Sequence, residues 1–119
     1  MARVAALIPD LLFGSKVQGM LQGAGHEVEL VTGGFEGWSA PDAVDVLVVD
    51  LVTDGFDGVA LRQRLAADGE LGRARSLAVY SHVDADTRAR ALGAGFDLVV
   101  PRSRMVREGA DLVTRLVGA

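Results

Sequence analysis

Five short apolar runs recur along the chain, and each is long enough for one β-strand. They are rich in Val, Leu and Ile, and polar and apolar positions do not alternate in them. The runs cover residues 4–8, 28–31, 44–49, 77–80 and 98–100. Short continuous runs of this kind are typical of parallel strands that are covered on both faces. The pattern therefore predicts a buried parallel sheet.

Segments with helical spacing separate these runs. The expected helices cover residues 11–23, 57–68, 84–93 and 104–117. In the first of them the apolar positions at helical spacing are Leu12, Met20, Leu21 and the stem of Lys16, which are expected to face the sheet. Asp84 precedes the third helix and Ser103 the last, and both are residue types that cap helix N-termini. Alternating strands and helices predict an α/β domain with a doubly wound, five-stranded parallel sheet and helices on both faces.

One helix of this alternation is expected to be short or missing. Residues 32–43 contain three glycines and a proline, which disfavour a long helix between the second and third strands. Phe35 and Trp38 are the large apolar side chains of the segment. We expect them to cover the part of the sheet that the missing helix leaves open.

Length and composition narrow the class of protein. The 119 residues are predicted to form one domain, residues 1–119, and half of them are apolar. There is no cysteine, no signal-peptide pattern and no apolar run of the ~20 residues that a membrane helix needs. We therefore expect a cytoplasmic protein that does not bind membranes.

Charge is spread unevenly over a net charge of −4. Residues 1–72 carry four basic and eleven acidic side chains, a net of −7, and residues 73–119 carry eight arginines and five acids, a net of +3. This asymmetry favours contacts between proteins, or it reflects only the solvent faces of the helices. The acidic balance and the absence of a dense basic patch argue against nucleic-acid binding.

The third apolar run ends on an acid, Asp50, and continues through an Asp- and Gly-rich loop into a helix. Open α/β sheets place ligands and chemistry at the carboxyl ends of their strands. With two histidines and no cysteine, the sequence offers no arrangement of nucleophile and base or of metal ligands for catalysis. We therefore expect no enzymatic activity, and Asp50 is the leading candidate for a functional residue.

The chain resembles the receiver domain of bacterial response regulators along nearly its whole length. Residues 50–58 resemble the family's phosphoacceptor strand and loop, in which an Asp is followed eight positions later by a Gly. Ala-Gly-Phe-Asp at 94–97 and Ala-Gly-His-Glu-Val at 24–28 resemble the segments before its fifth and second strands. The resemblance implies a flavodoxin-like sheet with strand order 2-1-3-4-5 and a role in two-component signal transduction.

The resemblance also implies a phosphorylation site, which this chain matches only in part. Asp50 stands at the acceptor position, and Ser81 and Arg102 stand at the positions that contact the phosphoryl group. The family holds Mg²⁺ with an acidic pair after the first strand, but here only Asp10 is acidic, and Pro9 precedes it. Asp10 and Asp50 would form a weak Mg²⁺ site or none, because Mg²⁺ requires near-octahedral oxygen ligands. Alternatively, Asp10 caps the first helix.

Two more positions depart from the family's pattern. His82 stands where a very small residue usually admits the phosphodonor, although a lone histidine is more often a simple loop side chain. Val99 stands where an aromatic residue reports phosphorylation. These departures predict an atypical receiver, a pseudo-receiver, that works mainly through protein–protein interaction and needs no cofactor unless it is phosphorylated.

The partner implied is a signalling protein or a histidine kinase. A homodimer is also implied, through the face formed by the family's fourth helix, fifth strand and fifth helix, here residues 84–93, 98–100 and 104–117. One alternative is a genuine phosphoacceptor, with Asp50 phosphorylated by a histidine kinase. Another is a flavodoxin-like domain that binds a small molecule, although no nucleotide-binding glycine loop follows the first strand.

Overall fold

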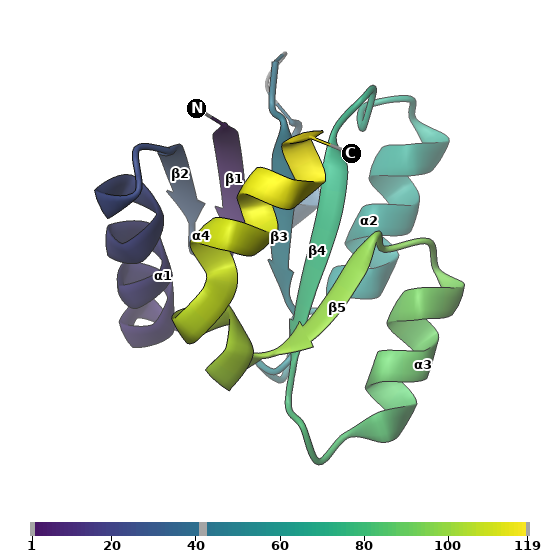
Figure 1. Ribbon diagram of the computed structural model, residues 1–119. Coiled ribbons are helices and arrows are strands. Elements are labelled where there is room, and N and C mark those ends of the chain that lie inside the picture. Colours follow the sequence, from purple (N-terminus) through teal and green to yellow (C-terminus); the bar gives the residue numbers. More distant parts are fainter. Residues whose placement is uncertain (1, 41–42, 119) are drawn as a thin grey trace.

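The computed structural model describes residues 2–40 and 43–118. Its five strands form one parallel sheet in the order β2-β1-β3-β4-β5. The strands are β1 (Arg3–Leu7), β2 (Glu27–Val31), β3 (Val46–Asp50), β4 (Arg75–Tyr80) and β5 (Leu98–Pro101). Figure 1 shows that all five point toward the same edge of the sheet. This confirms the predicted fold and its strand order.

Four α-helices cover the two faces of the sheet. They are α1 (Leu11–Gly23), α2 (Gly58–Ala67), α3 (Ala85–Gly93) and α4 (Arg102–Gly118). Alternate positions of the strands pack against α1 and α4 on one face, in a cluster that includes Val17, Met105 and Leu112. The other positions pack against α2 and α3, around Leu65 and Ala91. In Figure 1 the yellow α4 crosses the front of the sheet.

The predicted loss of one helix is confirmed. Between β2 and β3 the described residues form a single turn of 3-10 helix, η1 (Phe35–Gly37). Phe35 and Trp38 are half-buried and pack against the cluster on the α2 and α3 face, as expected. The Arg64 guanidinium holds this segment by donating to the carbonyl oxygens of both residues, at 3.2 and 3.0 Å.

Gly58 allows α2 to begin directly against the end of β3. A Cβ atom at this position would lie 2.5 Å from a methyl carbon of Val49 and 2.7 Å from one of Leu51, well inside van der Waals contact. Only glycine fits this approach without displacing its neighbours. The packing gives a physical reason for the glycine that follows Asp50 by eight positions.

Three sequence-based expectations were wrong. Ser103 does not cap the last helix, because α4 begins one residue earlier, at Arg102. In α1 Leu21 is buried and Met20 packs against the core as expected, but Leu12 and Lys16 are exposed, and the buried face is completed by Phe13, Gly14 and Val17. β2 is not covered on both faces: Glu27 and Glu29 are exposed on the side where the helix is missing.

Candidate functional site

Three charged side chains from distant parts of the chain meet at the carboxyl edge of the sheet. Asp50 is the last residue of β3, Asp10 lies between β1 and α1, and Arg102 is the first residue of α4. The Arg102 guanidinium donates from Nη2 to Asp50 Oδ2 at 2.8 Å and from Nη1 to Asp10 Oδ2 at 3.1 Å. One arginine therefore bridges two carboxylates that lie 40 positions apart in the sequence.

The Asp50 carboxylate is fully buried, with no exposed surface. Besides Arg102, its described donors are the Thr53 hydroxyl, at 2.9 Å from Oδ2, and the Val52 N–H, at 3.0 Å from Oδ1. A buried carboxylate is costly to the folded state unless it has an opposite charge and hydrogen bonds. Asp50 has both, and its Oδ2 atom already accepts two hydrogen bonds.

Arg102 is held in place by an aromatic ring as well as by the carboxylates. Its guanidinium carbon lies 4.2 Å from the centroid of the Phe13 ring, which α1 presents toward the site. Such stacking orients the planar guanidinium, and a lysine ammonium would not share it in the same way. The Nε atom of Arg102 is buried and has no hydrogen-bond partner in the described part of the chain. The guanidinium therefore makes its hydrogen bonds to the two carboxylates through its terminal nitrogens, Nη1 and Nη2.

Asp10 has two structural roles. Its Oδ1 atom accepts a hydrogen bond from the Phe13 N–H at 3.2 Å, which confirms the interpretation of Asp10 as the N-cap of α1. Its other oxygen pairs with Arg102. The Phe13 N–H and, after it, the Arg102 guanidinium lower the pKa of Asp10 below its ordinary value, because both favour the charged carboxylate.

The side chains present do not fit a magnesium ion. Mg²⁺ would need oxygen ligands that are free to coordinate it, and here Asp10 and Asp50 both bind Arg102 instead. Nowhere among residues 2–40 and 43–118 do three or more acidic, histidine or cysteine side chains gather in a way that suits a metal ion. The guanidinium already supplies the positive charge between the two carboxylates.

Ser81, His82 and Val99 are not among the partners of Arg102 in the hydrogen bonds and ion pairs that join it to Asp10 and Asp50. Ser81 is half-buried and lines a hollow of about 400 Å³ together with residues 51–59, Asp84 and Arg90. His82 is exposed. Val99 is half-buried and packs against the cluster on the α2 and α3 face. Asp84 caps α3 as predicted, and the Thr87 hydroxyl and N–H that it accepts from lower the pKa of Asp84.

Thr53 and Phe13 were not identified by sequence reasoning. Thr53 follows Asp50 by three positions, a spacing at which a hydroxyl can fold back onto an acid that ends a strand. Phe13 follows Asp10 by three positions at the start of a helix, and its ring lies beside the Arg102 guanidinium. These two spacings were the available signals, and both are weak without knowledge of where Arg102 lies.

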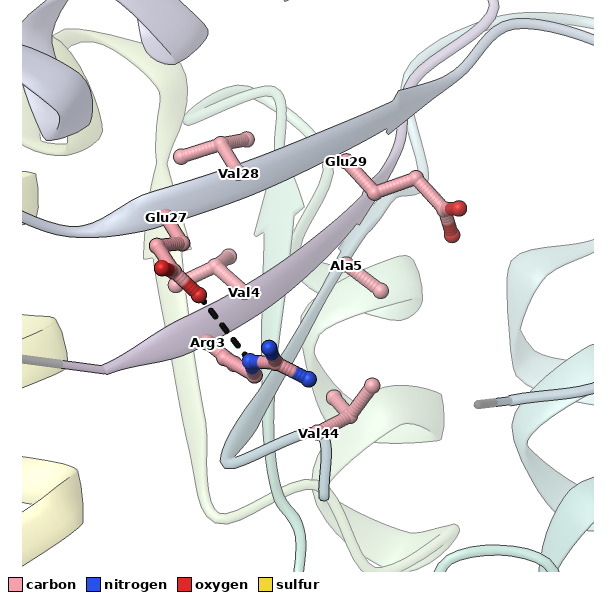
Figure 2. Close-up of a pocket in the computed structure, with 7 residues that line it drawn as sticks. All are labelled: Arg3, Val4, Ala5, Glu27, Val28, Glu29 and Val44. Carbon is pink, nitrogen blue, oxygen red and sulfur yellow. Dashed lines mark hydrogen bonds and ion pairs between the residues drawn. The ribbon is translucent and has the colours of Figure 1, made fainter. Parts of the chain in front are cut away.

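A second hollow lies at the opposite, amino edge of the sheet. It has a volume of about 250 Å³, and β1, β2 and Val44 line it. Figure 2 shows Arg3 and Glu27 paired across neighbouring strands, with Glu29 extending away from the pair. The Arg3 and Glu27 side chains are 60% and 68% exposed. The hollow exists because no helix covers this part of the sheet, and its charged groups are solvated.

Solved structures with this fold include receiver domains of response regulators. The non-phosphorylated receiver domain of HemR from Leptospira biflexa has a TM-score of 0.82 and 19% identity, over 100% of this chain and 96% of that one. The BeF3-activated receiver domain of DrrB, a Thermotoga maritima protein, has a TM-score of 0.82 and 18% identity, over 100% and 99%. A candidate pilus assembly protein (CpaE) from Burkholderia thailandensis has a TM-score of 0.81 and 18% identity, over 100% of both chains.

No protein-family model and no curated protein matches the sequence. At identities below 20% the structural similarities speak for the fold and not for the chemistry of the site. In the described part of the chain no helix is long and apolar enough to cross a membrane. The chain therefore has the fold of response regulator receiver domains, with an Asp10–Arg102–Asp50 cluster at the carboxyl edge of its sheet.

Proposed function

We propose that this chain is an atypical receiver domain that acts in signal transduction mainly by binding other proteins. The observation that carries the proposal is the ion pair between Arg102 and the fully buried Asp50, at 2.8 Å. A phosphoacceptor carboxylate must present an oxygen to the incoming phosphorus atom. Here Oδ2 is occupied by Arg102 and Thr53, and Oδ1 accepts from the Val52 N–H.

The two residues at the phosphoryl-contact positions, Arg102 and Ser81, are also poorly placed to support phosphoryl transfer in this proposal. In this proposal Arg102 would stand in for the family's lysine, but its charge is already shared between Asp10 and Asp50. Phosphoryl transfer depends on cations that neutralise the charge of the transferring group. Because Arg102 is paired with two carboxylates and the side chains do not fit a metal ion, we expect this neutralisation to be lost. The Ser81 hydroxyl carries no charge and would replace it only weakly.

Binding through the α3, β5 and α4 face is the activity we assign instead. α3 buries only Ala91 among its residues, whereas Leu92 and the preceding Val83 are 44% and 80% exposed. The charged residues of this face are mixed in sign: Asp84, Asp86, Arg88, Arg90, Arg104, Arg107, Glu108, Asp111 and Arg115. We infer a signalling protein or a second copy of the chain as the partner, because exposed apolar positions ringed by charges are typical of protein interfaces.

The fold comparisons are compatible with this proposal. One neighbour is described as a candidate pilus assembly protein, whereas others are described as receiver domains. The same architecture therefore occurs in proteins described in different terms. A role in binding, separate from phosphorylation, is within what this architecture carries.

The test is incubation with acetyl phosphate and MgCl₂, followed by intact-mass measurement. We expect no phosphoryl adduct on the wild-type chain under conditions that label a typical receiver domain used as a positive control. The variant Asp50→Asn is the matched negative control. An adduct that forms on the wild type and is lost in Asp50→Asn would establish the alternative, a genuine phosphoacceptor.

A further inference from the structure

The Arg102 guanidinium lies between two carboxylates in the way that a bound cation would. Its Nη1 and Nη2 atoms contact Asp10 and Asp50, at 3.1 and 2.8 Å. We propose that Arg102 is the resident cation of this domain, and that it takes the place of a divalent metal and excludes Mg²⁺ from the site. This inference concerns metal binding, so it goes beyond the proposed function and does not depend on it.

Arginine suits this place better than a metal does. A guanidinium stays charged, is weakly hydrated and presents several donors in one plane, whereas Mg²⁺ gives up its waters reluctantly and needs more oxygen ligands. Phe13 is 8% exposed, and its ring lies 4.2 Å from the guanidinium carbon, which holds the plane over the strand ends. With only two carboxylates available, the site therefore favours the guanidinium.

Removal of the guanidinium would expose a latent cation site. Asp50 would lose its counter-charge and keep Thr53 and Val52 as its donors, and Asp10 would keep its cap to Phe13. A buried carboxylate without a counter-charge is costly to the folded state. An added divalent cation would restore the missing charge, so the variant should gain stability from Mg²⁺ although the wild type does not.

The experiment is thermal unfolding of the wild type and of Arg102→Ala, each in saturating MgCl₂ and in NaCl of equal ionic strength. We expect Mg²⁺ to raise the Tm of Arg102→Ala by about 4 °C or more and that of the wild type by less than about 1 °C. If Arg102→Ala does not fold in NaCl, the readout becomes the yield of folded protein after refolding, which should rise in MgCl₂.

Two further variants identify the groups responsible. Arg102→Lys keeps a positive charge and should gain no stability from Mg²⁺. The double variant Asp50→Asn/Arg102→Ala lacks the buried charge and should gain none either. A gain in the double variant equal to that in Arg102→Ala would place the metal elsewhere and overturn the proposal.

Two other results would also overturn it. One is an equal gain in Tm for the wild type and Arg102→Ala, which would mean that the arginine does not exclude the metal. The other is no gain, in Tm or in refolding yield, for Arg102→Ala. No phosphodonor is present, so either result leaves the phosphorylation test of the proposed function unaffected, and an adduct in that test would not decide this one.

Discussion

Two arginine–carboxylate pairs of nearly equal length lie at opposite edges of the sheet. Arg102 and Asp50 meet at 2.8 Å at the carboxyl edge, and Arg3 and Glu27 meet at 2.9 Å at the amino edge. The first pair is 28% and 0% exposed and the second is 60% and 68% exposed. The two distances therefore do not show which pair stabilises the fold more. Burial does, because water screens the charges of the exposed pair but cannot solvate the buried Asp50 in place of Arg102.

The residues around each pair are buried or exposed in the same way as the pair itself. At the carboxyl edge, Asp50 is surrounded by donors, and Gly58 brings α2 against the strand end. At the amino edge, no helix covers β2 on the face that carries Glu27 and Glu29, and Glu29 is exposed beside the Arg3–Glu27 pair (Figure 2). We therefore expect substitutions at the packed edge to lower the free energy of unfolding more than substitutions at the open edge do.

The largest expected effect comes from removing the guanidinium at the packed edge. Arg102→Ala should lower the free energy of unfolding by about 3–5 kcal/mol, because it leaves a buried carboxylate without its counter-charge. Urea denaturation at neutral pH without Mg²⁺ measures this loss. A loss of less than about 1 kcal/mol would mean that the buried pair behaves like an exposed one.

A smaller effect is expected from filling the close approach beside Asp50. Gly58→Ala should lower the free energy of unfolding by about 1–3 kcal/mol, since the new Cβ would meet Val49 and Leu51. Gly33→Ala is the matched control, because a Cβ there would meet no atom within 4 Å. The control should change stability by about 0.5 kcal/mol or less. Equal losses of unfolding free energy in Gly58→Ala and Gly33→Ala would contradict the claim that the packed region is the more sensitive one.

Acid should weaken the packed edge through Asp10. The pKa of Asp10 in the folded protein is lowered, mainly by the Phe13 N–H and then by Arg102. Its contribution to stability is therefore complete above the ordinary carboxyl pKa of about 3.9, and it is lost as the pH falls through the lower, folded-state pKa. Asp10→Asn keeps a helix cap but has no titrating group, so its stability should fall less steeply below about pH 4 than that of the wild type. Urea denaturation at a series of pH values measures both slopes, and parallel curves would contradict the assignment.

The smallest effect is expected at the open edge. Arg3→Ala should change the free energy of unfolding by about 0–1 kcal/mol, because its partner Glu27 stays solvated. The same denaturation experiment, repeated in high salt, should leave wild type and variant nearly equal. A loss as large as that of Arg102→Ala would show that burial does not separate the two pairs.

The sequence predicted the elements and the sheet better than it predicted the site. Apolar runs and helical spacing depend on local periodicity, so the strands, the four helices and the missing one were found within a few residues. Phe35 and Trp38 were correctly placed over the open sheet because no other large apolar residues lie nearby. The buried face of α1 was predicted only in part: Leu21 is buried, but Leu12 continues the apolar pattern and is 86% exposed.

The cluster itself could not be predicted from the sequence. Asp10, Asp50 and Arg102 were each identified as candidates, but nothing local shows that one guanidinium reaches both carboxylates. That contact depends on where α4 begins, and Ser103 was wrongly expected to lie before its first turn. The stacking of Arg102 on Phe13 is likewise a tertiary contact between elements at opposite ends of the chain.

The most direct test of the central claim is a double-mutant cycle between Arg102 and Asp50. It compares the free energies of unfolding of the wild type, Arg102→Ala, Asp50→Asn and the double variant at neutral pH. A buried pair that secures this site should give a coupling energy of about 2 kcal/mol or more. A coupling energy below about 0.5 kcal/mol, as expected for the exposed Arg3–Glu27 pair, would contradict the claim that Arg102 holds Asp50 in a closed ion pair.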